Sequence, residues 1–437
     1  MEELLLTVEQ VAWNLPRRFL TEHAWHLRRA WNRLGSNARA LAGYNIFWTI
    51  PNAFAGIYLL VYMKEQGLTE IEIGSIVSAQ LTVQVVCAVF AGWVAERFGR
   101  LRVVTWVDGL CWPLAFFFFT FARGYLMFAI GFMLVGGVFL LIPAWNSLFL
   151  QGSPKRERMS MFAILQIPWF IGAILASASG FLVREIGVTR SCRWIFGCAV
   201  LLTSFAVWYR GKHLTNPDPP ARPVRLSFRE FERFLLGHWI ALQAVVRGRR
   251  LMIALLMQVL FQAGLIIGGT YTNLYLVDAR GVGLPKPVLA MLPLVGGTTV
   301  LLTTFLAVPH LAAGNLFRFL FTGIGCMGVN VLLLLLAPLF GLPAVLLAVL
   351  FGSVGFAVFN PAVNAHWTEH MNDAERARLD GFRWVVTMLV NIPIPVFAGA
   401  LYKEVHPRMP LFLILTCYGL ILACALWAIS ERKRSAR

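Results

Sequence analysis

Residues 92–102 read GWVAERFGRLR, a charged and glycine-containing stretch between two long apolar runs at 71–95 and 103–121. Gly99 permits a tight turn, and Glu96, Arg97 and Arg100 place charge at that turn. An apolar run of about 20 residues is long enough to cross a bilayer as a helix. The stretch therefore predicts a helical hairpin with both helices in the membrane and a basic turn outside it.

The rest of the chain repeats this pattern. Its 437 residues are 58% hydrophobic and 14% charged, with a mean hydropathy of +0.70. This composition excludes a soluble single domain, a disordered chain and a disulfide scaffold. The sequence lacks the period-2 alternation of apolar and polar residues that would predict a β-barrel. We expect an all-α polytopic membrane protein with twelve spans, at about 41–63, 71–95, 103–121, 125–149, 160–183, 194–209, 251–277, 287–308, 315–338, 341–365, 383–402 and 410–430.

The net charge of +17 has a topological explanation. With the spans assigned in order, 29 of the 38 Lys and Arg residues fall on one side and 9 on the other. Cytoplasmic loops carry such an excess, which places both termini in the cytoplasm. Because the charges lie at span ends, nucleic acid is not expected as a partner. We expect an integral protein of a bacterial inner membrane.

Two cytoplasmic segments are predicted to be amphipathic helices. One lies in an N-terminal arm, 1–40, where it could contact anionic inner-leaflet lipids or the protein's own loops. The other lies in a central linker, 211–248, after the Pro-rich stretch 216–223. These segments divide the chain into a six-helix half at 41–210, a second half at 249–430 and a basic tail at 431–437.

The two halves resemble each other. Pro143 to Ser147 (PAWNS) matches Pro361 to Ala365 (PAVNA) at an offset of 218 residues, about half the chain length. Six spans return the chain to the same side, so the repeats share an orientation and are related by an axis along the membrane normal. Two such halves enclose a central cavity, and rocking them gives alternating access.

The 92–102 stretch, at the link of spans 2 and 3, resembles the signature loop of the major facilitator superfamily, Gly-x-x-x-Asp-Arg-x-Gly-Arg-x-Arg/Lys. The resemblance covers all twelve spans and implies a secondary transporter. It also implies gating roles for Gly92, which allows close helix approach, and for Glu96, which approaches the start of span 11. Arg97, Gly99 and Arg100 complete the predicted gate. Glu96 replaces the usual Asp, and the Arg usual in span 4 is absent near Ile130.

Asp108 is the one acid well inside an apolar run, where an ionised side chain needs a partner or a role. It is either a proton-coupling site or a structural clasp paired with Gln80 or Gln84. The family resemblance favours the clasp, because span 3 usually lies outside the cavity.

Polar residues of spans 1 and 7 are the predicted substrate contacts, since the resemblance implies that spans 1, 4, 7 and 10 line the cavity. Asn52 and Gln262 are the leading pair, and interhelical hydrogen bonding is the alternative role. The full set is Asn45, Trp48, Asn52, Gln258, Gln262 and Asn273. Asn146 and Asn364, at equivalent repeat positions, are assigned to capping or to the inner gate.

No cofactor or metal site is expected. His366 and His370 have ligand spacing but no evident fourth ligand, and the seven cysteines show no CxxC pair. No P-loop or nucleophile motif is present, so neither ATP-driven transport nor an enzyme is expected. The sequence favours transport of a small molecule by a chain sufficient as a monomer, with protons or another ion as the candidate coupling partner. Export of amphiphilic compounds leads slightly, a neutral polar solute such as a sugar is the alternative, and a non-transporting receptor or scaffold is the alternative of another class.

Overall fold

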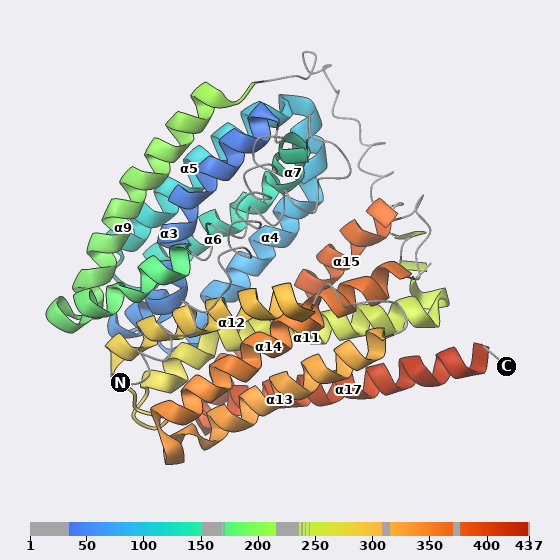
Figure 1. Ribbon diagram of the computed structural model, residues 1–437. Helices are drawn as coiled ribbons and strands as arrows, with labels where there is room; N and C mark the ends of the chain where they lie inside the picture. The colour runs from blue at the N-terminus through green and yellow to red at the C-terminus, as the bar shows by residue number, and fades with distance from the viewer. Residues whose placement is uncertain are drawn as a thin grey trace, which may run out of the picture.

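The computed structural model describes residues 35–150, 171–215, 245–307, 315–369 and 376–435, with a few isolated positions between 168 and 243. All regular structure in these ranges is helical (Figure 1). The predicted N-terminal arm helix and most of the predicted linker helix lie outside the described residues.

The N-terminal half contains the helices drawn from blue to green in Figure 1. They are α3 (Ser36–Glu65), α4 (Glu70–Phe98), α5 (Arg100–Phe121), α6 (Tyr125–Gly137), η1 (Val138–Leu140), α7 (Ile142–Leu150) and α9 (Ser179–His213). Gly187 interrupts α9 with φ 79°, so this segment joins the end of span 5 to span 6.

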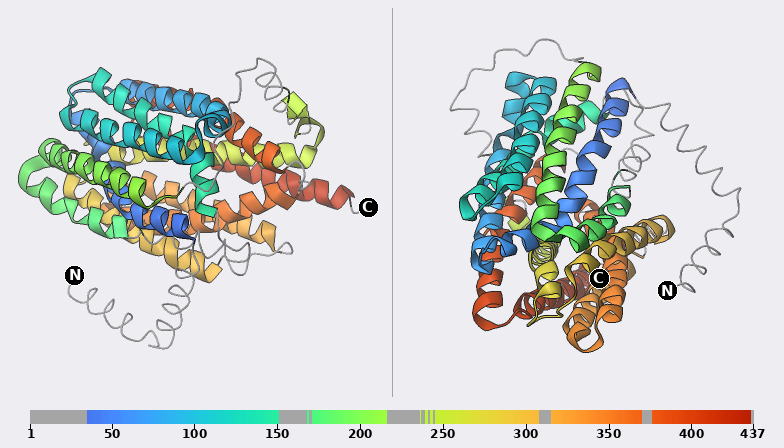
Figure 2. Two further views of the ribbon diagram at one scale, coloured as in Figure 1. Left: turned by 90° about the horizontal axis from the view of Figure 1, so that it is seen from above. Right: turned by 90° about the vertical axis from the view of Figure 1, so that its left-hand side faces the viewer.

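The C-terminal half follows from yellow to red. Its helices are α11 (Arg249–Val277), η3 (Lys286–Met291), α12 (Leu292–Ala307), α13 (Leu316–Phe340), α14 (Leu342–Glu369), α15 (Arg376–Asn391), α16 (Ile394–Ala400), η5 (Leu401–Val405) and α17 (Met409–Ser435). The two halves form separate bundles in Figure 1 and in the right-hand view of Figure 2.

Local sequence explains where the first hairpin begins and turns. Thr69 caps α4: its hydroxyl accepts from the Glu72 backbone N–H at 3.3 Å, and the Glu72 carboxylate accepts from the Thr69 N–H at 2.7 Å. This reciprocal arrangement satisfies donors that a helix start leaves open. At the other end Gly99 has φ 84°, a conformation that favours glycine, and separates α4 from α5. The predicted tight turn at Gly99 is confirmed.

Two spans are broken. Span 4 bends by 47° between α6–η1 and α7, where the backbone tightens into a 3₁₀ turn before Pro143. Span 11 breaks at Ile392 and Pro393, between α15 and α16. Pro393 has no N–H to continue the helical hydrogen-bond ladder, and the Asn391 amide nitrogen donates to the Thr387 carbonyl at 2.7 Å beside this break.

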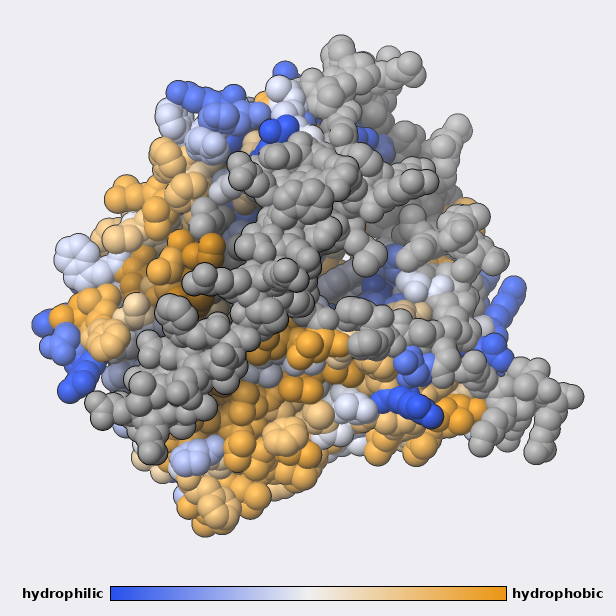
Figure 3. Space-filling model, viewed as in Figure 1, coloured by the Kyte–Doolittle hydropathy of each residue, from blue (hydrophilic) through white to orange (hydrophobic). Residues whose placement is uncertain are grey.

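The twelve-helix fold class is confirmed. Ten described helices are long and apolar enough to cross a membrane, and the bent α6–α7 pair is an eleventh. The remaining predicted span, 160–183, is described from residue 171 onward and at Pro168, and the described part is helical apart from a turn at Ala178. Hydrophobic side chains cover the face of both bundles in Figure 3, and hydrophilic ones gather near the bundle ends, as a lipid environment requires.

Candidate functional site

A central cavity of about 530 Å³ lies between the two bundles. Residues of α3, α4, α5, α6 and η1 form one side, and residues of α11 and α15 form the other. A cleft at the interface of two halves is a common place for a ligand site.

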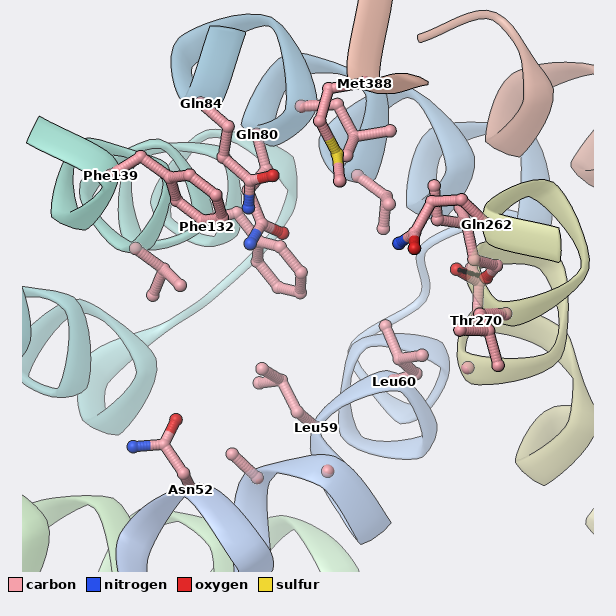
Figure 4. Close-up of a pocket in the computed structure, with 18 of the residues that line it drawn as sticks. Asn52, Leu59, Leu60, Gln80, Gln84, Phe132, Phe139, Gln262, Thr270 and Met388 are labelled. Carbon is pink, nitrogen blue, oxygen red and sulfur yellow. Dashed lines mark hydrogen bonds between the residues drawn. The ribbon is translucent and has the colours of Figure 1, made fainter. Parts of the chain in front are cut away.

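Four amide side chains face this cavity: Asn52 from α3, Gln80 and Gln84 from α4, and Gln262 from α11 (Figure 4). The structure thus brings Asn52 and Gln262 to one site, from opposite halves. The Asn52 amide nitrogen donates to the Trp48 carbonyl at 2.9 Å, one turn earlier in the same helix. Gln80 and Gln84 were expected to pair with Asp108, and that pairing is wrong. Their four-residue spacing, which puts both on one helix face, was the signal for a cavity role.

Aromatic rings and aliphatic side chains together supply nearly all of the remaining wall. Trp112, Phe116 and Phe119 come from α5, and Phe132 and Phe139 from span 4. Trp384 and Met388 of α15 lie on the opposite side. None of the described lining residues carries a charge. The cavity is therefore an apolar, ring-lined space with amides at several points of its wall.

One end of the cavity is closed by contacts between the halves. We call it the sealed end and define it by the loops 66–69, 278–285 and 406–408. The Tyr271 hydroxyl of α11 lies between the Glu70 carbonyl of the other half, at 3.2 Å, and the Pro395 carbonyl, at 2.6 Å. Tyr58 donates to the Lys286 carbonyl at 3.1 Å and Ser78 to the Ile392 carbonyl at 2.6 Å.

Asn273 belongs to this sealed end. Its amide nitrogen donates across the halves to the carbonyls of Gly56, at 3.3 Å, and Ile57, at 3.1 Å. It does not line the central cavity. The structure therefore gives Asn273 the interhelical role that was the alternative to substrate contact.

Charged side chains surround the sealed end. Lys286 and Glu65 form an ion pair across the halves at 2.6 Å. Asp278, in the loop after α11, accepts from the Tyr402 hydroxyl at 2.9 Å and from the Arg280 backbone N–H at 2.8 Å. Partial burial alone raises the pKa of Asp278, but these hydrogen bonds and the Arg280 charge outweigh it, so the pKa lies below its usual range.

The opposite, open end carries the predicted gate. Glu96 is exposed, and none of the ion pairs between described residues includes it. A Cβ at Gly92 would meet no heavy atom within 4 Å, so no helix of the described ranges packs closely against it. The Arg97 guanidinium lies 5.3 Å from the centroid of the Trp93 ring, one turn away. Arg100 begins α5. No hydrogen bond or ion pair joins Glu96 to the described part of span 11, so its gating role stays a prediction.

The two repeat-related asparagines differ in their surroundings. Asn146 on α7 is exposed. Asn364 on α14 accepts a hydrogen bond from Arg383 of α15 at 2.8 Å and donates to the Asn360 carbonyl at 2.8 Å. Asn364 therefore joins spans 10 and 11 within one half. Asn146 makes no equivalent hydrogen bond among the described residues.

Asp108 is paired with an arginine. Arg210, near the end of α9, is fully buried and forms an ion pair with Asp108 Oδ2. The Tyr44 hydroxyl donates to the same oxygen at 3.2 Å. Arg210 lies one residue beyond the predicted span 194–209 and was therefore counted among the loop charges. An ion pair inside the half agrees with the clasp role, although the partner differs from the one expected.

The other predicted contacts lie apart from the central cavity. Asn45 and Trp48 line a second cavity beside it. Gln258, one turn before Gln262, lines neither cavity, and its amide oxygen is buried without a hydrogen bond from the described residues. All seven cysteines are free thiols. No group of three potential metal ligands occurs within the described ranges.

The sequence model of the family described as "Major Facilitator Superfamily" matches residues 40–384 of this chain. This chain belongs to that superfamily. The fold of two six-helix halves and the cavity between them are those of a membrane transporter of this family, so transport is the class of function.

The relatives that this chain matches are named for different compounds. The chain is 26% identical over 197 residues to a cis,cis-muconate transport protein of Acinetobacter baylyi, and 23% identical over 249 residues to a probable galactarate/D-glucarate transporter of Escherichia coli. These alignments span 46% and 54% of the relatives, or about half their length, and 44% and 51% of this chain. A 20% identical alignment with the quinolone resistance protein NorA of Staphylococcus aureus covers 90% of this chain and 97% of that protein.

Solved transporters share the fold. A POT family transporter in complex with 5-aminolevulinic acid superposes with a TM-score of 0.70 at 15% identity, covering 92% of this chain and 96% of the other. The nucleoside transporter NupG superposes with a TM-score of 0.67 at 15% identity, covering 91% and 99%.

Proposed function

We propose that this chain moves a neutral, amphiphilic small molecule across the membrane by alternating access, as a secondary active or facilitative transporter. The observation that carries the proposal is the lining of the central cavity: amides from both halves, aromatic rings, and no charged side chain among the described lining residues. Amides donate and accept hydrogen bonds, and the rings offer apolar contact area.

The cavity argues against a doubly charged cargo. Muconate and the sugar diacids named for two relatives carry carboxylates, which need cationic or multiple hydrogen-bonding partners when they leave water. The described cavity wall offers no Lys or Arg for that purpose. The breadth of the aromatic wall instead favours an apolar body with a few polar groups, and with it the export of amphiphilic compounds.

A sugar-like neutral solute is the second candidate. Asn52, Gln80, Gln84 and Gln262 would bond hydroxyl groups, and rings such as Trp112 would stack on a sugar face. Removal of an amide distinguishes the two candidates. A polyol should lose most of its binding, because hydrogen bonds supply it, whereas an amphiphile should lose less.

We place the protein in a bacterial inner membrane with both termini in the cytoplasm. The distribution of Lys and Arg supports this orientation. The sealed end then faces the outside, and the open end faces the cytoplasm. A monomer suffices, because one chain supplies both halves of the cavity.

The test is flux in proteoliposomes, with and without an imposed pH gradient, across sugars, nucleosides and neutral amphiphiles. Gln262→Leu runs beside wild type, with Gln66→Leu at the sealed end as the matched substitution outside the cavity. We expect amphiphile flux in wild type and about a 3- to 10-fold rise in KM for Gln262→Leu, the worth of one hydrogen bond. Gln66→Leu should leave KM unchanged.

Three results would change the assignment. Flux of sugars alone, lost in Gln262→Leu, would replace the amphiphile with a polyol. Saturable binding without flux would identify a receptor or scaffold. Flux driven by the pH gradient and abolished in Asp108→Asn, in protein that still folds, would make Asp108 a proton-coupling residue and overturn its role as a clasp.

A further inference from the structure

A second cavity of about 430 Å³ lies inside the N-terminal half, beside the central one. We call it the side pocket. It is bounded by the first turns of α3, by α5, and by span 4 on both sides of its bend. Trp112, Val135 and Phe139 line both cavities, so the two are neighbours that share a wall. Phe139 is labelled on that wall in Figure 4.

Of the Asp108–Arg210 ion pair, only the negatively charged Asp108 faces this pocket. Asp108 lines the pocket, whereas Arg210 does not line it and is fully buried behind it. Arg210 is held in place by its second nitrogen, which donates to the Val104 carbonyl at 2.7 Å, and by the Tyr44 ring, 4.6 Å from its guanidinium carbon. The orientation of the pair is therefore fixed by the Val104 backbone behind the pocket and by Tyr44 in its wall.

One oxygen of Asp108 is left for a ligand. The hydrogen bonds from Tyr44 and Arg210 both go to Oδ2, and Oδ1 accepts none from the described residues. Asp108 is only 3% exposed. A carboxylate oxygen in such surroundings favours a hydrogen-bond donor, and a charged donor most of all.

Aromatic rings form much of the remaining pocket wall, together with aliphatic side chains and the amide of Asn45. Its rings are those of Tyr44, Trp48, Trp112, Phe139 and Trp145. Trp48 and Trp112 meet edge to face with centroids 5.2 Å apart. Trp145 stacks on Phe149 at 5.1 Å, which fixes the Trp145 ring in place. The faces of indole and phenol rings attract cations, and indole is the strongest of them.

We propose that the side pocket binds an organic monocation: a protonated amine on a flat, apolar body, with the ammonium group donating to Asp108 Oδ1 and resting against the rings. The pocket volume lies within the usual range for small-molecule sites. Binding here is a property separate from transport through the central cavity, and its test does not depend on flux.

The test is equilibrium binding of radiolabelled phenethylammonium to the purified full-length protein in lipid nanodiscs, with 2-phenylethanol as the neutral analogue. We expect the ammonium to bind at least 10-fold more tightly than the alcohol. Trp145→Leu, which leaves the ion pair intact, should weaken ammonium binding about 5-fold. Trp106→Leu is the matched control, because Trp106 is on the same helix as Asp108 but is 76% exposed and outside the pocket.

Asp108→Asn alone would leave the buried Arg210 without a counter-charge, which could prevent folding. The double variant Asp108→Asn with Arg210→Gln removes both charges and keeps polar groups of similar size. It should bind the ammonium no better than the alcohol, with an unfolding midpoint close to that of wild type as the check on folding.

Three outcomes would overturn the proposal. In the first, wild type binds the alcohol as tightly as the ammonium. In the second, Trp145→Leu and Trp106→Leu bind alike. In the third, Gln262→Leu weakens ammonium binding as much as Trp145→Leu does, which would place the ligand in the central cavity instead.

Discussion

The sealed end and the open end of the molecule differ in where their polar contacts go. Among the described residues, the hydrogen bonds and ion pairs that join the two halves lie at the sealed end, from Tyr58, Ser78, Tyr271, Asn273 and the Lys286–Glu65 pair. Toward the open end, polar contacts stay within a half. Asn37 with Thr215 and Asn364 with Arg383 are examples.

This difference shows how the closed state can be both specific and reversible. Most bonds across the sealed end run from a hydroxyl or amide to a backbone carbonyl, and each such bond in a membrane protein contributes about 0.6 kcal/mol on average. A half-exposed ion pair such as Lys286–Glu65 adds about 0–1 kcal/mol. A handful of these contacts sums to a few kcal/mol. That is the same order as the roughly 5.5 kcal/mol that shifts a two-state equilibrium from 1:99 to 99:1.

The largest effect is expected when a cross-link holds the sealed end closed. Glu65→Cys with Lys286→Cys, in a background whose native cysteines are replaced, can be joined by a short cleavable thiol cross-linker. We expect complete loss of flux on cross-linking and recovery after cleavage, because the halves can no longer separate at that end. Each single variant, treated in the same way, is the control. Flux that survives the cross-link contradicts rocking of the halves.

A methyl group at a close contact should open the same end. A Cβ on Gly74 would lie 2.6 Å from the Tyr271 hydroxyl and closer still to the Pro395 carbonyl oxygen. Overpacking of this kind costs about 1–3 kcal/mol. Gly74→Ala should therefore raise the accessibility of sealed-end thiols to a membrane-impermeant reagent about 5- to 100-fold. Gly43→Ala, where the added methyl meets no atom within 4 Å, should not change it.

Removal of one hydroxyl should have a smaller effect of the same sign. Tyr271→Phe deletes the donor between Glu70 and Pro395 and should raise the same accessibility about 3- to 10-fold, as expected for about one hydrogen bond. Tyr62→Phe is the matched control. The Tyr62 hydroxyl is also buried, but it donates to the Ala122 carbonyl within its own half at 3.2 Å. Equal effects of the two variants would remove the distinction between contacts across halves and contacts within a half.

The smallest effect concerns pH. The pKa of Asp278 lies below its ordinary value of 3.8, so its hydrogen bonds stabilise the folded state above that value and are lost as the pH falls through the lowered pKa. Acidification from pH 7.5 to 5 should leave the contribution of Asp278 to the unfolding midpoint unchanged. The measurement compares wild type with Asp278→Asn at pH 7.5, 5 and 3. A difference that disappears already at pH 5 would contradict the lowered pKa.

The fold was readable from the sequence because the spans, the Gly99 turn and the internal repeat are all local or periodic patterns. The pairing of Asn52 with Gln262 across the cavity also followed, once spans 1 and 7 were placed together by the family resemblance.

Other parts of the site could not be predicted. The partner of Asp108 lies 102 positions away, on a helix whose end the hydropathy pattern cut short before Arg210. Gln80 and Gln84 were misassigned because helix periodicity gives the face of a residue but not what that face meets. Asn273 lies near the end of α11, and only the packing of the halves decides that it bonds the α3 backbone.

The most direct test of alternating access is a pair of distances measured in one protein by double electron–electron resonance. Spin labels at Glu185 and Glu404 report on the sealed end, and labels at Lys212 and Ser430 report on the open end; all four positions are exposed. The account predicts that Gly74→Ala lengthens the first distance and shortens the second in the same population. A change at the sealed end with no opposite change at the open end would contradict the rocking of two rigid halves about the central cavity.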